Sequence, residues 1–454
     1  MKATMKKINM PMMLVALFFL AGIGIATAQD TAAIHHEFSA KQAVDYALKN
    51  NVQVKNALLE VKIQEQTNRE LTGIAYPQIS GSGSLVYNWK LPVSLVPAEF
   101  FGGTPGTFEK FPFGVKWNAT GGISLNQIIF DGQVFIGLKA RDALIDFQEK
   151  NVEVTEETVI ANVYKVYYQL VASKTQIELL DENIARLEKL QHDTRIMFDN
   201  GFAERLDVDK LAVQIANLQT EKVAVIARVS NGYLGLKVLM GMPVREELVL
   251  TDTLNDSMIR DAVLDASQFN YSQRAEYQYA NIGLQLKEYD IKRYKQAKIP
   301  TLSFNGYYNK NAQRNDFSFF KEGDWFDVSA LTLTLNVPIF QGFAANARIA
   351  RAKISMQQSL NQLEALKINI DNEILTAQNN FSAALSSLNF QQKNMELAQT
   401  VFDQTRKKFE AGTGSQTEIN TAQTDLKTAQ NNYINALYTA IIARVDFLKA
   451  TGRL

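Results

Sequence analysis

One stretch of this sequence, Phe198-Asp-Asn-Gly201, recurs 211 residues later as Phe409-Glu-Ala-Gly412. Each copy is followed by a helical pattern that ends in a second glycine. Such a stretch is typical of a helix end, a tight turn that a glycine at positive φ permits, and an antiparallel partner helix. Repetition of this kind predicts two copies of one structural unit. The positions in register are Phe198/Phe409, Gly201/Gly412, Asp207/Glu418, Val208/Ile419, Ile215/Leu426, Gln219/Gln430, Val223/Ile434, Leu236/Phe447 and Gly241/Gly452.

The segments that lead into the two turns predict very long helices. Between Gln133 and Phe198, apolar residues recur every seven residues, a period that favours a coiled coil. At about 1.5 Å per residue, such a helix reaches roughly 100 Å. A second ladder with the same period begins at Ile349. We therefore expect two long antiparallel helical hairpins, with shorter helices before them over residues 39–76 and 267–298.

Before each long helix the period of the pattern changes to two, which predicts β-strands. Residues 79–87 and 115–125 alternate apolar or glycine positions with mostly polar ones, and residues 301–308 and 331–337 form a second such pair. About ten alternating residues suit a transmembrane barrel strand, and a soluble antiparallel sheet with one wet face has the same alternation. The residues expected to face lipid are Val115, Trp117, Ile123, Leu125, Leu302, Phe304, Leu331, Leu333 and Leu335.

The repeated motifs resemble those of the TolC-like outer membrane efflux channels. One motif is the double Phe-x-x-Gly followed six residues later by a carboxylate. The other is the double Ile-Phe-x-Gly at Ile129–Gly132 and Ile339–Gly342, each before a long helix. Both motifs occur twice, in order and in register, and the resemblance covers nearly the whole chain after residue 28.

The resemblance implies a homotrimer embedded in outer membrane lipid. Four strands from one chain would leave open edges that lipid cannot hydrogen-bond, so the strands by themselves indicate only that one chain is insufficient. Three chains would supply a barrel of twelve strands, from which the helices continue as a tunnel into the periplasm. The implied fold is mixed, with long antiparallel coiled-coil hairpins, four transmembrane β-strands per chain and a two-fold internal repeat.

The resemblance also assigns a function to the two turns. In the family, the periplasmic end of the tunnel is shut at rest and opens when a periplasmic adaptor, bound to an inner-membrane transporter, docks there. The family's gate carboxylate corresponds to Asp207 and Glu418. Thr421 and Gly414 depart from the second acid and the basic latch of some members, and both carboxylates equally fit a role beside the positive end of a helix dipole. The turn residues assigned to adaptor docking are Phe198, Gly201, Leu206, Phe409, Gly412 and Ile419.

The first 28 residues have the pattern of a secretory signal peptide. A lysine-rich start, an apolar run over Met12–Ile25 and an Ala26-Thr27-Ala28 cleavage site precede Gln29. The apolar run is short for a transmembrane anchor, and after Gln29 we find no stretch that approaches a spanning helix. We expect export to the outer membrane. The expected parts are a signal peptide (1–28), a first repeat (29–241, with a loop at 89–114), an irregular equatorial connector (242–266) and a second repeat (267–454, with a loop at 310–326).

Composition argues against several other classes of function. Lysine plus arginine equals aspartate plus glutamate at 47 each, and no basic stripe exists that would neutralise nucleic acid. The chain has no cysteine and only three scattered histidines, so we expect no disulfide framework and no zinc site. We find no nucleophile–base pair and no nucleotide-binding motif. We therefore expect neither an enzyme nor a cofactor.

Two functions fit these patterns, a duct through the outer membrane and a soluble periplasmic coiled-coil adaptor. The adaptor predicts one hairpin beside a compact β-rich domain, whereas the duct predicts two equivalent hairpins, each preceded by a pair of strands. The duplication favours the duct, which would export small molecules or secreted substrates. The sequence identifies neither the cargo nor the pump and adaptor, and it does not show whether the outer loops close the pore.

Overall fold

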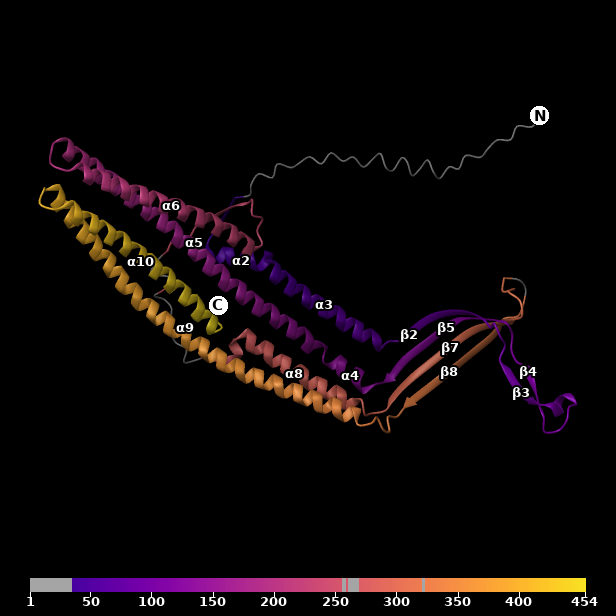
Figure 1. The fold of residues 1–454 in the computed structure, drawn as a ribbon. Coiled ribbons are helices and arrows are strands. Elements are labelled where there is room, and N and C mark those ends of the chain that lie inside the picture. The colour runs from indigo at the N-terminus through magenta and orange to yellow at the C-terminus, as the bar shows by residue number, and fades with distance from the viewer. Residues whose placement is uncertain (1–34, 255–258, 260–268, 321–322) are drawn as a thin grey trace, which may run out of the picture.

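The computed structural model of this chain describes residues 35–254, 259, 269–320 and 323–454. Within these ranges the molecule is elongated, with long helices at one end and a β-sheet at the other (Figure 1). The expected signal peptide lies outside the described residues, as does most of the expected connector beyond residue 254. The two hairpin turns lie together at the end of the molecule farthest from the sheet (Figure 1).

The elements occur in the same order in the two halves of the chain, with short strands and turns added. The first half contains β1 (His35–Phe38), α2 (Ala40–Asn50), α3 (Val52–Ile74), β2 (Gln78–Tyr87), β3 (Val93–Pro97), η1 (Ala98–Phe101), β4 (Phe108–Pro112), β5 (Trp117–Phe130), α4 (Gly132–Lys139), α5 (Arg141–Asp199) and α6 (Arg205–Met240). The second half contains β6 (Glu247–Leu250), η2 (Tyr271–Gln273), α8 (Ala275–Gln296), β7 (Thr301–Arg314), β8 (Phe326–Asn336), α9 (Ala344–Glu410) and α10 (Gln416–Ala450).

The long helices form as the heptad pattern predicts, with two breaks that the pattern does not show. Helices α5 and α9 contain 59 and 67 residues, which corresponds to about 90 and 100 Å. The helix expected from Gln133 onward is interrupted at Ala140, between α4 and α5. The first helix is interrupted at Asn51, whose side chain accepts hydrogen bonds from the backbone N–H groups of Gln53 and Val54 and so begins α3.

The core is distributed along the helices instead of forming one compact centre. One cluster surrounds Tyr167 where β1, α2, α5 and α6 meet, and a second lies nearer the turns around Leu211 and Ile419. Between the hairpins, the buried amide of Asn183 donates to Gln430 Oε1 (2.9 Å) and accepts from Gln423 Nε2 (2.7 Å). A polar layer that is paired in this way can fix the register of packed helices.

Four antiparallel strands form one sheet in the order β2-β5-β7-β8. The strands are longer than expected, because β5 and β7 contain 14 residues each. Residues 89–114, expected as a loop, contain the hairpin β3–β4, which projects away from the end of the sheet (Figure 1). Within the described residues, neither β2 nor β8 has a neighbour on its outer edge.

The described part of the expected connector contains a strand that the sequence analysis missed. Strand β6 pairs in parallel with β1, with His35 opposite Glu247 and Phe38 opposite Leu250. The alternation over four residues is too short for a periodicity argument, and the pairing joins segments that are more than 200 residues apart. This small sheet packs beside α2 and links the chain that precedes α2 to the chain that leaves α6.

Among the residues that the structure describes, one helix is apolar enough to cross a membrane by length and composition alone, against the sequence-based expectation of none. It is α6. Its residues Leu211, Leu218 and Val225 are buried in the cluster shared with α5. In this fold, α6 is one arm of a helical hairpin.

The two hairpins end at joints of similar geometry. Gly241 and Gly452, which follow α6 and α10, adopt φ values of 70° and 66°. A Cβ on Gly241 would lie 2.3 Å from the carbonyl oxygen of Asn50, and one on Gly452 would lie 2.6 Å from that of Gln273. Each glycine therefore allows both a left-handed conformation and a close approach of two backbones.

At each joint, the side chain of a residue that precedes a neighbouring helix also binds the end of the hairpin. This residue is Asn51 before α3 and Arg274 before α8. Asn51 Nδ2 donates to the carbonyl oxygen of Leu239 (2.6 Å), in the last turn of α6. Arg274 Nη1 donates to the carbonyl oxygen of Ala450 (2.9 Å), the last residue of α10. Both side chains satisfy a carbonyl that a helix C-terminus leaves without an intrahelical partner.

Candidate functional site

The register of the sheet gathers the residues expected to face lipid on one side. Ile123 lies opposite Tyr308, and Leu125 lies opposite Gly306, which in turn lies opposite Leu331. Because neighbours in register point the same way, one face carries every strand residue of the expected set. These residues are Trp117, Ile123, Leu125, Leu302, Phe304, Leu331, Leu333 and Leu335.

Val115 was also expected to face lipid, but it lies outside the sheet. Strand β5 begins at Trp117. The side-chain amide of Asn88 donates to the carbonyl oxygen of Val115 (3.0 Å), and the Asn88 backbone N–H donates to Lys116 (2.7 Å). The strand pair therefore begins two residues later in β5 than the apolar alternation indicates, and Asn88 binds the two residues that precede the strand.

The opposite face of the sheet is polar. Ser80 Oγ lies 2.8 Å from Ser124 Oγ, and Asn305 Nδ2 donates to Thr334 Oγ1 (3.4 Å). Val86, Tyr307, Val328 and Ala330 also lie on this face. Its polar residues include Ser80, Ser82, Ser84, Asn118, Thr120, Ser124, Asn126, Asn305, Asn309, Asn311, Thr332 and Thr334. The sheet therefore has one side suited to an apolar environment and one suited to water.

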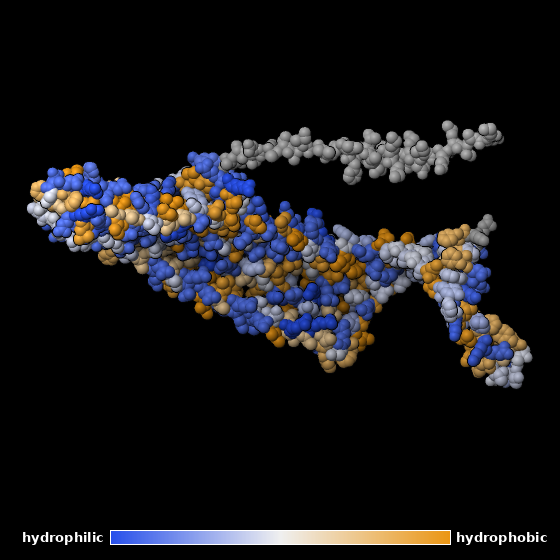
Figure 2. Space-filling model, turned by 45° about the horizontal axis from the view of Figure 1, so that its top comes forward, coloured by the Kyte–Doolittle hydropathy of each residue, from blue (hydrophilic) through white to orange (hydrophobic). Residues whose placement is uncertain are grey.

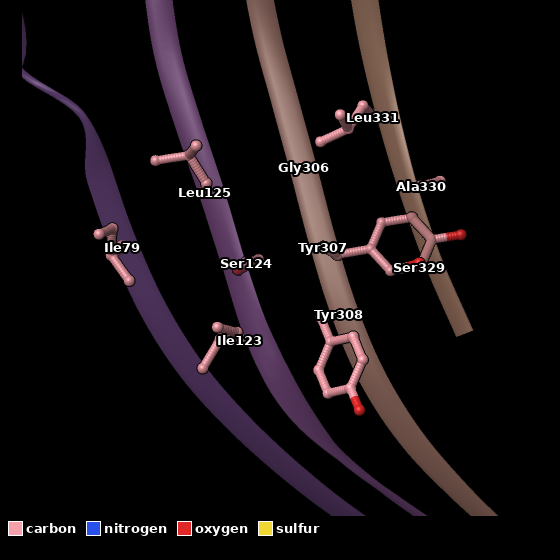
Figure 3. A pocket seen from close by; sticks show the side chains of 10 residues that line it. All are labelled: Ile79, Ile123, Ser124, Leu125, Gly306, Tyr307, Tyr308, Ser329, Ala330 and Leu331. Atoms are coloured by element: carbon pink, nitrogen blue, oxygen red, sulfur yellow. The ribbon is translucent and has the colours of Figure 1, made fainter. Parts of the chain in front are cut away.

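The apolar face is open to its surroundings in a single chain. Leu331 is 78% exposed, and Ile123, Leu333 and Leu335 are exposed as well. A shallow hollow of about 720 Å³ lies on this face, where Gly306 leaves space between Leu125 and Leu331 (Figure 3). Exposed apolar surface of this extent marks an interaction with membrane or with another protein.

Aromatic residues cluster at both ends of the strands. At the outer end of the sheet, which is the end farthest from the helices, the ring centroid of Trp117 lies 4.5 Å from that of Tyr87 and 5.1 Å from that of Phe317. At the inner end, Phe130 lies 5.6 Å from Phe135. In the space-filling view, apolar side chains gather over the outer end of the sheet and over the β3–β4 hairpin (Figure 2). Aromatic rings at two levels are typical of a membrane-spanning sheet.

At the first hairpin turn, Gly201 adopts φ 81°, as the sequence predicts for the residue after a helix. Asp207 lies in the first turn of α6 and pairs with Lys210 (3.4 Å). Phe202 is 80% exposed and Leu206 is 56% exposed. The first turn therefore presents apolar side chains to its surroundings.

At the second hairpin turn, Gly412 adopts φ 74° and α10 begins with a capping box. Ser415 Oγ accepts from the backbone N–H of Glu418 (3.2 Å), and Glu418 Oε2 accepts from the backbone N–H of Ser415 (3.4 Å). Ile419 is fully buried behind the turn. In this conformation the Glu418 carboxylate is bound to its own helix N-terminus, in agreement with the helix-dipole alternative.

A cleft of about 470 Å³ separates the two turns. Asp207 lines it from the first turn, and Phe409 and Gly412 line it from the second, whereas Glu418 does not line it. Phe409 is 7% exposed and Phe198 is 37% exposed. The structure thus brings one of the two expected gate carboxylates to the space between the turns and leaves the other on the outside of its helix.

Apolar stripes run along the outsides of two helices. Six exposed apolar residues of α9 fall on one narrow face at 100° per residue, and α6 has a broader face of this kind. On α9 they are Ile354, Ile368, Leu375, Phe390, Leu397 and Val401, and on α6 they are Val213, Val223, Ile226, Leu234 and Val238. Stripes of this kind normally pack against another helix.

A family model described as "Outer membrane efflux protein" matches residues 43–242 and 272–453. The chain belongs to the outer membrane efflux protein family. The matched ranges contain both hairpins and all four strands of the large sheet. Proteins of this family are outer membrane channels that extend into the periplasm, and it is a family of channel-tunnel proteins and not of enzymes.

Characterised relatives and solved structures agree with this assignment. The outer membrane efflux protein BepC of Brucella suis is 23% identical over 90% of this chain and 84% of its own length. The outer membrane protein TolC of Vibrio cholerae is 20% identical over 73% of this chain and 76% of its own length. The crystal structure of CusC superposes with a TM-score of 0.75 at 17% identity, over 92% of this chain and 93% of CusC.

Two structural features of this outer membrane efflux protein, one at the second hairpin turn and one beside the large sheet, were not predicted from the sequence. The capping box of Ser415 and Glu418 has the signature Ser-x-x-Glu, which the sequence would have revealed. The β3–β4 hairpin has no periodic signal that distinguishes it from a loop. Among the residues that the structure describes, no group of three or more histidine, aspartate or glutamate side chains could hold a metal ion.

Proposed function

We propose that three copies of this outer membrane efflux protein close one barrel of twelve strands in the outer membrane. The observation that carries the proposal is the sheet β2-β5-β7-β8, which has an apolar face, a polar face and two open edges. Open edges leave N–H and C=O groups that lipid cannot satisfy. Pairing of β2 in one chain with β8 in the next removes every edge and turns the polar face toward a water-filled pore.

The dimensions of the strands support a membrane-spanning role. Strands β2 and β8 contain 10 and 11 residues, and a tilted transmembrane strand needs about 9 to 11. The aromatic clusters around Trp117 and Phe130 then lie at the two membrane surfaces. The exposed residues Ile123, Leu331 and Leu333 face the hydrocarbon between them.

The helices support the same assembly on the periplasmic side. The apolar stripes of α6 and α9 have no partner within the described part of one chain, and neighbouring chains would cover them. Helices of roughly 100 Å then form a tunnel that continues from the barrel into the periplasm. In this assembly the chain is a passive export channel for small molecules or secreted substrates. Export is also the activity named for a relative, the pyoverdine export outer membrane protein OpmQ of Pseudomonas aeruginosa, which is 22% identical.

The hairpin turns are the proposed periplasmic gate. A periplasmic adaptor, itself bound to an inner-membrane transporter, would dock on the turns through exposed residues such as Phe198 and Leu206. Phe409 and Ile419 are buried and would support the turns from within. Asp207 supplies negative charge to the space between the turns, and three copies would form a ring that favours cations. Glu418 would contribute only after its capping box opens. Two equivalent hairpins also argue against the alternative, a soluble adaptor with a single hairpin.

Conductance in a planar bilayer tests this function. We expect the purified protein to run as a trimer after cross-linking and to give small, cation-selective steps. Replacing Asp207 and Glu418 together by alanine should enlarge the steps or reduce their selectivity, with most of the change reproduced by Asp207→Ala alone. Asp209→Ala is the matched control, because Asp209 is exposed on the same helix and does not line the cleft. A well-folded protein that never conducts would contradict the channel, and unchanged steps would place the gate elsewhere.

A further inference from the structure

Near the middle of the helical body, four distant segments enclose a hollow of about 350 Å³. They are the first turn of α2, the middle of α5, the chain after β6 and the last turns of α10. The volume lies at the lower end of the range for small-molecule sites. We name it the equatorial hollow, and its lining residues are Ser39, Ala40, Lys41, Tyr164, Tyr168, Asp252, Ile441, Arg444, Val445, Leu448, Arg453 and Leu454.

Cationic side chains dominate the polar part of this lining. Lys41, Arg444 and Arg453 line the hollow together with two carboxylates. One is that of Asp252, of which one oxygen already accepts from the backbone N–H of Ala40 (2.9 Å), and the other is the terminal carboxylate of Leu454. None of the three cationic side chains forms an ion pair with a residue that the structure describes. Positive charge converging on one concave surface favours a negatively charged ligand.

Arg444 carries a buried donor without an acceptor. Its Nε atom is inaccessible to solvent and has no hydrogen-bond partner among the described residues. A buried donor in this state is costly, and buried polar groups in folded proteins are normally paired. A bound anion beside the guanidinium would add the acceptors that the hollow lacks, and arginine binds phosphate and carboxylate groups particularly well.

The remaining wall suits an apolar body attached to the anion. The rings of Tyr164 and Tyr168 are nearly parallel, with centroids 6.3 Å apart, and Ile441, Val445 and Leu448 complete the wall. Burial raises the pKa of both tyrosine hydroxyls. The hydroxyls therefore stay protonated at neutral pH and are available as donors to an anion.

We propose that the equatorial hollow binds a small organic anion, in which a phosphate or carboxylate group is carried on an apolar body. Arg444 and Arg453 hold the anionic group, the exposed Lys41 adds a third positive charge, and the tyrosine and aliphatic side chains contact the body. The site lies in the helical body, apart from both the sheet and the hairpin turns. A ligand there would bridge α2, α5 and α10 and stabilise the joint between them.

The position of the hollow indicates where such a ligand comes from. Tyr164 is 23 residues from Arg141 at the sheet end of α5, a distance of about 35 Å along the helix. A lipid headgroup at the proposed membrane surface would have to travel that distance. We therefore expect a soluble anion, and a lipid headgroup is the other source of the same chemistry.

Calorimetric titration of the purified full-length protein with phenyl phosphate tests the proposal. We expect saturable binding of one molecule per chain, with inorganic phosphate and phenol each binding at least about tenfold more weakly, because each supplies half of the contacts. Arg444→Gln should weaken phenyl phosphate about tenfold, the effect of losing a charged hydrogen bond. Arg453→Gln should act in the same direction, and its exposed side chain makes this variant safe for folding. Arg351→Gln, an exposed cation on α9 outside the hollow, is the matched control.

Each outcome decides for or against the site. Loss of affinity in the two hollow variants but not in Arg351→Gln supports it. Failure of phenyl phosphate to saturate the folded protein would overturn it, as would phenol binding with equal affinity or an equal loss in the control. Displacement of the probe by a short-chain phosphatidylglycerol would identify the lipid source, and its failure to compete would identify a soluble anion.

Discussion

The first joint is held by the neutral amide of Asn51, whereas the second is held by the guanidinium of Arg274. The two bonds have the same kind of acceptor, since each side chain donates to a carbonyl in the last turn of a hairpin. Arg274 adds contacts to Glu276 (2.7 Å) and Glu373 (3.0 Å), and its side chain is 1% exposed. The Arg274 side chain therefore ties α8, α9 and α10 together, while the Asn51 side chain ties the junction of α2 and α3 to α6.

The two turns differ in the same sense as the two joints. Both have a glycine in the left-handed region, but the first exposes Phe202 and Leu206 where the second has Thr413 and Thr417. Helix α6, which follows the first turn, has no side-chain cap at Glu204, whereas Ser415 caps α10, which follows the second turn. Backbone geometry is thus common to the two units, and the side chains around it differ. The second unit is the more firmly fixed at both its joint and its turn.

Breaking the charged joint should have the largest effect. Arg274→Ala removes a buried guanidinium with three hydrogen-bonded partners, and we expect the free energy of unfolding to fall by about 3 kcal/mol. Asn51→Ala removes a cap and one buried hydrogen bond, for which about 1.5 kcal/mol is expected. Thermal unfolding followed by far-UV circular dichroism would measure both. Equal losses for the two variants would show that the extra contacts of Arg274 add no stability.

Alanine substitutions at the glycines would measure the cost of a close backbone approach separately from the cost of a left-handed conformation. Gly241→Ala adds the cost of positive φ to a clash with a backbone oxygen at 2.3 Å, and about 2 to 3 kcal/mol is expected. Gly201→Ala meets nothing within 4 Å, so only the conformational cost of about 1 kcal/mol remains. Gly452→Ala and Gly412→Ala are the corresponding joint and turn variants of the second hairpin. If joint and turn variants lost equal stability in urea titrations, the close approach at the joints would carry no energetic weight.

The pattern of the sequence was sufficient for the long helices and for the sides of the sheet. A heptad ladder and strict alternation are local properties, so residues such as Ile123 and Leu333 could be assigned to one face before any pairing was known. The positive φ of Gly201 and Gly412 followed from the residue type and its place after a helix. The family assignment rested on motifs that the sequence repeats, and the family match agrees with it.

The features that could not be predicted depend on contacts between residues that are far apart in the sequence. Gln219 and Gln430 are in register, yet Gln219 is exposed and Gln430 is buried against Asn183. The pairing of β1 with β6 and the burial of Arg274 likewise arise from segments that the sequence does not place together. At the candidate gate, the repeated motif predicts the same role for Asp207 and Glu418, whereas in the structure Asp207 is the one of these two that lines the cleft.

The smallest expected effect concerns the cap that distinguishes the two turns. Ser415→Ala should lower the free energy of unfolding by about 1 kcal/mol, because the backbone N–H of Glu418 loses its acceptor. Glu204→Ser should raise it by about 0.5 kcal/mol, since a serine hydroxyl could accept from the backbone N–H of Asp207 at the first turn. Hydrogen exchange of the amides in the first turns of α6 and α10 would measure these local changes directly. If Glu204→Ser left exchange at the first turn unchanged while Ser415→Ala accelerated it at the second, the exposed apolar residues Phe202 and Leu206, and not the missing cap, would set the mobility of the first turn.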